Sequence, residues 1–169
     1  MPNTTSLTIE NSLNKLQIKE SVIVLAFSIL IPFMIHFIPV SGNSVGAVLL
    51  PIFIAPFIAV VFFRLNVGLS AAILSPVLNY LLTGNPVYGT VGIITIELCL
   101  FVLIAKLLIN LKYVKYFAAP ISIVISMFFT QIVFSSLNHF TVVLYTALPG
   151  IILISIINVL IFPLSNKAN

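Results

Sequence analysis

Six long runs of mostly apolar residues, separated by short polar connectors, occupy most of this sequence. They cover roughly residues 22–40, 45–63, 67–83, 88–111, 117–137 and 141–164. A helix that crosses the hydrocarbon core of a bilayer needs roughly 20 residues, whereas a membrane β-strand needs about 9–11 residues of alternating polarity. The run lengths therefore predict an all-α integral membrane protein, a bundle of six transmembrane helices.

The amino-acid composition also indicates that the chain lies in a lipid bilayer. Hydrophobic residues make up 61% of the chain and charged residues 6%, whereas soluble domains are about 45–50% apolar and about 25% charged. So few charges cannot coat a water-facing surface, which excludes a cytosolic enzyme, a nucleic-acid-binding module and a disordered chain. We expect residues 1–21 to form a polar cytoplasmic N-terminal tail, 22–164 the six-helix transmembrane domain, and 165–169 a cytoplasmic C-terminal tail.

The connectors predict turns and an orientation. They are residues 41–44, 64–66, 84–87, 112–116 and 138–139, rich in Gly, Asn, Ser and Pro. With six crossings, every lysine and arginine falls on one side, namely Lys15, Lys19, Arg64, Lys106, Lys112, Lys115 and Lys167. By the positive-inside rule, both termini and the even-numbered connectors are then cytoplasmic.

Uncharged polar residues collect toward the opposite side of the predicted bundle. Ser75, Asn79 and Thr83 recur at four-residue spacing in the third run, and Ser122, Ser126 and Thr130 do so in the fifth. Such stripes face protein or water; close packing of small residues explains them as well as a ligand does. Prolines within or beside the runs are expected to kink helices, namely Pro32, Pro51, Pro56, Pro76, Pro120 and Pro149.

Glu97 is the only acidic residue within an apolar run. It lies nine residues beyond Tyr88, roughly 13 Å along a helix, and so close to mid-depth. A charge there costs about 2.5–3.5 kcal/mol on insertion scales, so the carboxyl group needs a partner, an aqueous cavity or its proton. We expect Glu97 to accept hydrogen bonds from a bound solute or from a residue of its cavity. The alternative is a protonated Glu bonded to a neighbouring carbonyl or Asn.

Motifs for catalysis are missing from the sequence. It has no P-loop, no carboxylates at metal-ligand spacing and no Ser–His–Asp grouping, and its single cysteine, Cys99, offers neither a disulfide nor a metal cluster. We therefore expect no enzyme activity, no cofactor and no metal site, with any ATP hydrolysis supplied by separate subunits.

Four segments of the sequence form a recognisable pattern, namely HFIP at 36–39, LLPI at 49–52, LSPVLNYLLTGNP at 74–86 and IEL at 96–98. Together they resemble the substrate-binding S components of energy-coupling-factor (ECF) transporters. The resemblance implies a six-helix protein of the bacterial plasma membrane that captures a vitamin or similar micronutrient at its outer side. It implies a transmembrane coupling subunit and two cytoplasmic ABC-type ATPases as partners. The candidate substrate-binding residues are Glu97, Asn79, Tyr80, Thr83, Asn85, His36 and Asn43.

The chain departs from the family pattern at two places. Phe53 stands where related sequences often carry His, and the first run has Ala26 alone where many S components show an Ala-x-x-x-Ala coupling patch. The coupling surface therefore stays unassigned. Two other functions remain open: a stand-alone secondary carrier driven by an ion gradient, and a non-transporting structural subunit of a membrane complex. The mid-depth Glu97 favours a neutral, cationic or hydroxyl-rich ligand, but the sequence does not name the substrate.

Overall fold

The computed structural model describes residues 4–36, 48–135 and 137–168, and all regular structure in these ranges is helical. Five apolar helices are long enough to cross a membrane. They are α1 (Thr4–His36), α4 (Leu65–Thr83), α5 (Tyr88–Ile109), α6 (Ala118–Phe134), which is preceded by the 3-10 turn η2 (Val114–Phe117), and α7 (Leu137–Ala168). The prediction of an all-α chain is confirmed for these residues, and the five long apolar helices are compatible with a multi-pass membrane bundle.

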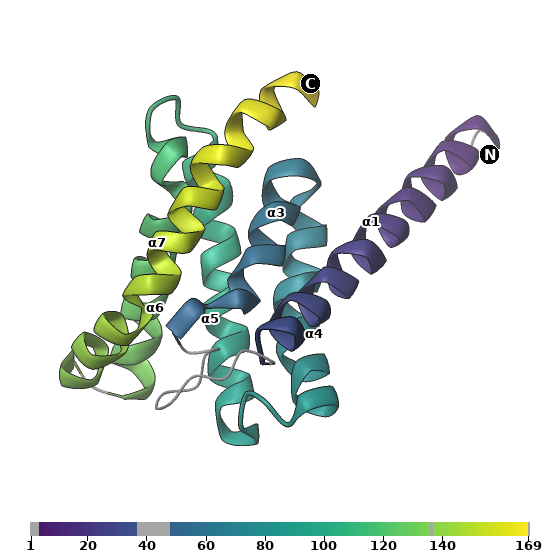
Figure 1. Ribbon diagram of the computed structural model, residues 1–169. Coiled ribbons are helices and arrows are strands. Elements are labelled where there is room, and N and C mark those ends of the chain that lie inside the picture. The colour runs from purple at the N-terminus through teal and green to yellow at the C-terminus, as the bar shows by residue number, and fades with distance from the viewer. Residues whose placement is uncertain (1–3, 37–47, 136, 169) are drawn as a thin grey trace.

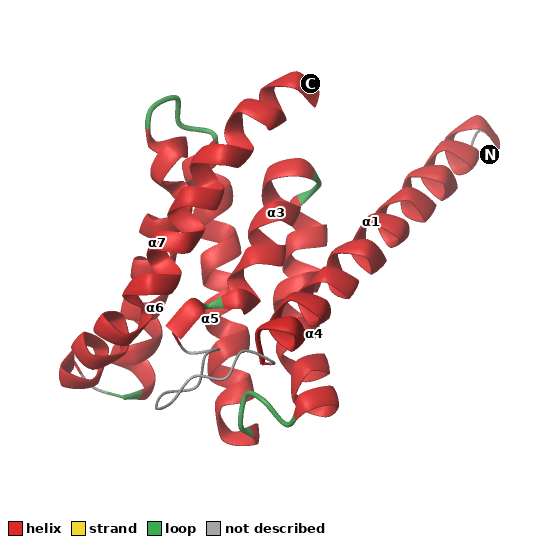
Figure 2. Ribbon diagram, in the orientation of Figure 1, coloured by secondary structure: helices red, strands yellow, loops and turns green. Residues whose placement is uncertain are grey.

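The chain runs back and forth between two ends of the bundle (Figure 1). The connection after α3 (Ile54–Phe62) and the connection after α5 lie at the end where both termini lie, and the connections after α4 and α6 lie at the other end (Figure 2). The connections at the terminal end contain Arg64 and Lys112. Arg64 and Lys112, two of the basic residues that the sequence assigns to one side, therefore lie at the same end of the bundle.

The second apolar run does not form one long helix in the described residues. It contains the 3-10 turn η1 (Pro51–Phe53) followed by the nine-residue α3, and the apolar helix from Pro51 to Phe62 is shorter than the five others. At about 1.5 Å per residue it covers roughly 18 Å, against a hydrocarbon core of about 30 Å. The helix begins here because Leu50 adopts a left-handed conformation with φ 50° and Pro51, which has no N–H to pair, follows it. The sixth crossing stays a prediction.

The short helix α3 lies at the centre of the packing. Its Phe57 is fully buried and packs near Phe101 of α5, and Phe53 meets the same ring edge-on with 5.1 Å between centroids. Small residues of α3, Ala55 and Ala59, pack with α1 and α4. These small side chains let α3 pack closely against α1 and α4 inside the bundle.

Several boundaries differ from the sequence prediction. Helix α1 begins at Thr4 and continues without a break into the first apolar run, so most of the expected N-terminal tail is helical. The predicted turn at 84–87 is confirmed, with Gly84 in the left-handed conformation that ends α4. The corner expected at 138–139 lies instead in the first turn of α7, because α6 already ends at Phe134. The connector at 41–44 lies outside the described residues.

The prolines fall into two groups. Pro51, Pro56 and Pro120 lie in the first turn of a helix, where the backbone N–H has no intrahelical partner and its loss costs little. Pro32 lies inside α1, Pro76 inside α4, and Pro149 and Pro163 inside α7. Only the second group removes hydrogen bonds from a helix interior.

Candidate functional site

Asn79 is a buried amide that joins two helices. Its side chain is 3% exposed, and its Nδ2 donates to the carbonyl oxygen of Ser28 on α1 (3.0 Å) and to that of Ser75 on α4 (2.8 Å). Both amide hydrogens are thereby used. Its Oδ1 is buried and has no hydrogen-bond partner among the described residues, and the same holds for the hydroxyl oxygen of the fully buried Ser75.

The next turn of α4 carries this polar stripe to the end of the bundle. Thr83 is half-buried, and its hydroxyl donates to the carbonyl oxygen of Asn79 (2.7 Å) and accepts from the N–H of Asn85 (3.2 Å). Asn85 is exposed in the connection between α4 and α5. Residues at four-residue spacing share one helix face, so the stripe runs from exposed Asn85 through Thr83 to buried Asn79 and Ser75.

Two tyrosines lie beside the outer end of this stripe. The ring centroids of Tyr80 on α4 and Tyr88 on α5 are 5.8 Å apart and the rings are tilted by 51°, which is a favourable aromatic contact. Tyr88 is exposed and Tyr80 is half-buried. This pair links the last turn of α4 to the first turn of α5 at the end of the bundle where the two helices are connected.

Glu97 has a hydrogen-bond donor on the neighbouring helix. Its side chain is 8% exposed, and the hydroxyl of Thr130 on α6 lies 3.2 Å from its Oε2. That hydroxyl also lies 3.0 Å from the carbonyl oxygen of Ser126 and 3.1 Å from that of Met127. One hydroxyl proton therefore serves three acceptors, and the carboxyl group retains capacity for further donors.

The three hydroxyl residues of the α6 stripe, Ser122, Ser126 and Thr130, form two kinds of hydrogen bond. The hydroxyls of Ser122 and Ser126 donate to carbonyl oxygens of their own helix, those of Ala118 (2.6 Å) and Ile123 (3.0 Å). They need no ligand, as the packing interpretation of the stripe expects. Thr130 differs from both serines because its hydroxyl reaches a side chain on another helix.

Asn79 and Glu97 lie in the same half of the bundle but bond to different helices. Ser75 is eight residues from the end of α4 at Thr83, and Glu97 is nine residues from the start of α5 at Tyr88, depths of roughly 12 and 13 Å. Helices α4 and α5 are joined by the short connection 84–87 and run antiparallel. The α4 stripe and the carboxyl group of Glu97 thus reach a similar depth. The side chain of His36 and the whole of Asn43 lie outside what the structure describes.

Asn158 is an internal polar residue that the sequence-based candidates did not include. Fully buried on α7, it accepts from the N–H of Ala119 (3.4 Å) and donates to the carbonyl oxygens of Lys115 (3.3 Å) and Tyr116. It therefore fixes the start of α6, the helix that carries Thr130. The sequence does carry a signal for it, because Asn158 interrupts an apolar run just as Glu97 does.

No group of three or more His, Cys, Asp or Glu side chains that could hold a metal ion occurs within residues 4–36, 48–135 and 137–168.

Comparison with known proteins assigns no family to the chain. The chain matches no known family model, no curated protein and no solved structure.

Proposed function

We propose that the chain is the substrate-binding S component of an ECF-type uptake transporter. It captures a small, polar, vitamin-like solute at the outer face and delivers it inward with a transmembrane coupling subunit and two ABC-type ATPases. The observation that carries this proposal is the pair of buried oxygens, Asn79 Oδ1 and Ser75 Oγ, that have no partner among the described residues. A buried polar atom left unpaired costs about 1–3 kcal/mol, and a solute that donates hydrogen bonds would offset that cost.

The surroundings of these atoms suit a small-molecule site. Such sites combine apolar walls with a few placed polar groups. The apolar bundle offers two acceptors in the same half, namely Asn79 Oδ1, about 6 Å from the end of α4, and the carboxyl group of Glu97, about 13 Å from the start of α5. Tyr80 and Tyr88 at the mouth offer aromatic faces for a planar ring. The site therefore favours a neutral or cationic solute with several N–H or O–H donors and disfavours an anionic group against Glu97.

The proposed topology has six crossings, both termini in the cytoplasm and a bacterial plasma membrane. The basic connections, which contain Arg64 and Lys112, support it because they share the end of the bundle where the termini lie. The stripe from Asn85 to Ser75 then opens to the outside, as capture of an external solute requires.

Co-purification tests the proposal. The protein is expressed in rich medium and purified in detergent, and bound small molecules are identified by mass spectrometry. We compare the unchanged chain with Asn79→Leu and with Glu97→Gln, which keeps the shape of the side chain. Thr95→Val is the matched control, because the hydroxyl of Thr95 bonds to the carbonyl oxygen of Val91 in its own helix (2.8 Å).

We expect one solute to co-purify at close to one equivalent with the unchanged chain and with Thr95→Val. The amount of bound solute should fall at least tenfold in Asn79→Leu and Glu97→Gln. Gel filtration checks that each variant is folded. Absence of any solute contradicts the proposal and favours a structural subunit. Equal retention in all variants places the solute elsewhere. Reconstitution without ATPases separates the remaining alternative, because a secondary carrier would accumulate the solute in response to an imposed ion gradient and an S component would not.

A further inference from the structure

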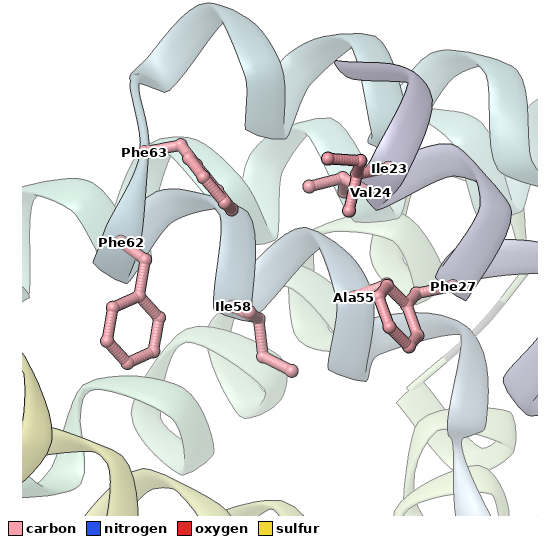
Figure 3. Close-up of a pocket in the computed structure, with 7 residues that line it drawn as sticks. All are labelled: Ile23, Val24, Phe27, Ala55, Ile58, Phe62 and Phe63. Carbon is pink, nitrogen blue, oxygen red and sulfur yellow. The ribbon is translucent and has the colours of Figure 1, made fainter. Parts of the chain in front are cut away.

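An apolar groove of about 470 Å³ lies between α1 and α3 (Figure 3). Figure 3 places Phe63, Ile23 and Val24 toward one end of the groove and Ala55 and Phe27 toward the other. All the side chains that line it are hydrocarbon, namely Ile23, Val24, Phe27, Ala55, Ile58, Phe62 and Phe63. The groove is separate from the polar stripe of α4, so its occupant is independent of the solute that the chain binds.

The groove is open on the outer surface of α1. Ile23 and Phe27 are each 52% exposed although they line it. Exposed large apolar side chains on a membrane helix face lipid, because the hydrocarbon core takes the place of water around such a surface. A lining without polar groups gives a polar solute nothing to bond, whereas a hydrocarbon chain fills it without loss of hydrogen bonds.

Two cations lie at one end of the groove. Lys19, Ile23 and Phe27 follow each other at four-residue spacing on one face of α1, so exposed Lys19 lies one turn, about 6 Å, beyond Ile23. Exposed Arg64 comes directly after Phe63. Because Ile23 and Phe63 mark the same end of the groove (Figure 3), Lys19 and Arg64 flank that end.

The acidic group nearby does not cancel these charges. Glu20 lies one turn before Val24, which lines this same end of the groove, and its Oε2 is buried with no hydrogen-bond partner among the described residues. Lys15 lies one turn beyond Lys19. Three cations (Lys15, Lys19 and Arg64) and one carboxylate leave a net charge of +2 at this end. A hydrocarbon groove that ends in a net positive group matches an acyl chain that ends in a phosphate.

We propose that the groove between α1 and α3 binds one acyl chain of an anionic phospholipid, whose phosphate lies between Lys19 and Arg64. The long side chains of Lys and Arg extend toward the headgroup layer from positions near the ends of membrane helices, which brings their charges to the depth of a lipid phosphate. The charge at the end of the groove favours this occupant over an apolar helix of another protein, because such a helix would bring no anion to these cations.

Tryptophan fluorescence tests the site, because the chain contains no Trp. A Phe27→Trp reporter is placed in the groove. Phe129→Trp on α6 is the matched control, since Phe129 is 53% exposed and does not line the groove. The full chain is reconstituted in phosphatidylcholine vesicles with increasing amounts of brominated phosphatidylglycerol, and quenching at each reporter gives the relative affinity of the two lipids. Ile23→Trp serves as a second groove reporter.

We expect quenching at Phe27→Trp to show preference for the anionic lipid and quenching at Phe129→Trp to follow the bulk lipid composition. Lys19→Gln and Arg64→Gln should each reduce the preference about fivefold, the effect of one cation near a membrane surface, whereas Lys112→Gln should leave it unchanged. Equal affinity for both lipids at the groove reporters would overturn the proposal. Protection of both groove reporters from either brominated lipid would also overturn it, because another protein segment then fills the groove.

Discussion

Replacement of Asn158 by Leu should strongly destabilise the bundle, because this one side chain holds two helices together. The amide connects the middle of α7 to the start of α6 through the carbonyl oxygens of Lys115 and Tyr116 and the N–H of Ala119. Leu has the same branching as Asn and leaves no cavity, but its two methyl groups are larger than the amide oxygen and nitrogen, so overpacking at this fully buried site adds to the loss of the hydrogen bonds.

The magnitude follows from the number of groups left unpaired. Interhelical hydrogen bonds inside membrane proteins contribute about 0.6 kcal/mol each on average, which gives about 2 kcal/mol for three. An unpaired buried group costs about 1–3 kcal/mol, but the bond to Ala119 is long, at 3.4 Å. We therefore expect Asn158→Leu to lower the free energy of unfolding by about 2–4 kcal/mol.

Reversible unfolding in mixed detergent micelles, followed by circular dichroism, measures this change. Ser155→Ala on the same helix is the control, because the hydroxyl of Ser155 bonds to the carbonyl oxygen of Ile151 one turn earlier in α7 (2.6 Å), and its removal should cost less than about 0.5 kcal/mol. A loss in Asn158→Leu no larger than that in Ser155→Ala would show that the interhelical bonds of Asn158 add no stability.

Two further substitutions probe close contacts. A Cβ atom on Gly150 of α7 would lie 2.7 Å from backbone atoms of residues 48–49, so Gly150→Ala should lower the free energy of unfolding by about 1–3 kcal/mol in the same assay. The control is Gly92→Ala, whose added Cβ would meet open space and whose stability should be unchanged or higher. Equal stability of the two variants would contradict the close approach of Gly150 to residues 48–49. Thr130→Val removes the described hydrogen-bond donor to Glu97 and should cost about 0.6–1.7 kcal/mol; an unchanged unfolding curve would indicate that Glu97 gains nothing from this contact.

The sequence predicts the long helices well because their signal is local. The runs that become α4 and α5 are apolar throughout, and Gly84 between them supplies the left-handed residue that ends a helix. The break at Leu50 could not be predicted in the same way, because an apolar run gives no sign of a positive φ in its middle. Helix α1 begins at Thr4, within the segment predicted to be a tail. A polar segment that extends a membrane helix has the same composition as a polar tail, so the sequence does not distinguish the two.

The candidate site was predictable only in part. Its members on α4 and α5 follow from spacing and from the cost of a polar group at depth. Their hydrogen-bond partners could not be predicted. Ser28 lies 51 residues from Asn79 in the sequence and Thr130 lies 33 residues from Glu97, and only the packing of the helices brings each pair together. The same is true of the contacts of Asn158, which join α7 to residues about 40 positions earlier.

Labelling of single cysteines in spheroplasts and inverted vesicles tests the proposed six crossings most directly, in a chain whose only native thiol is removed by Cys99→Ser. The informative pair is Lys19→Cys and Arg64→Cys, because α1 and the segment with the short helix α3 separate these positions. We predict that a membrane-impermeant reagent reaches both from the cytoplasmic side and reaches Tyr88→Cys from the outside. Labelling of Lys19→Cys and Arg64→Cys from opposite sides would mean that the segment 45–63 does not cross, and would contradict the six-crossing topology.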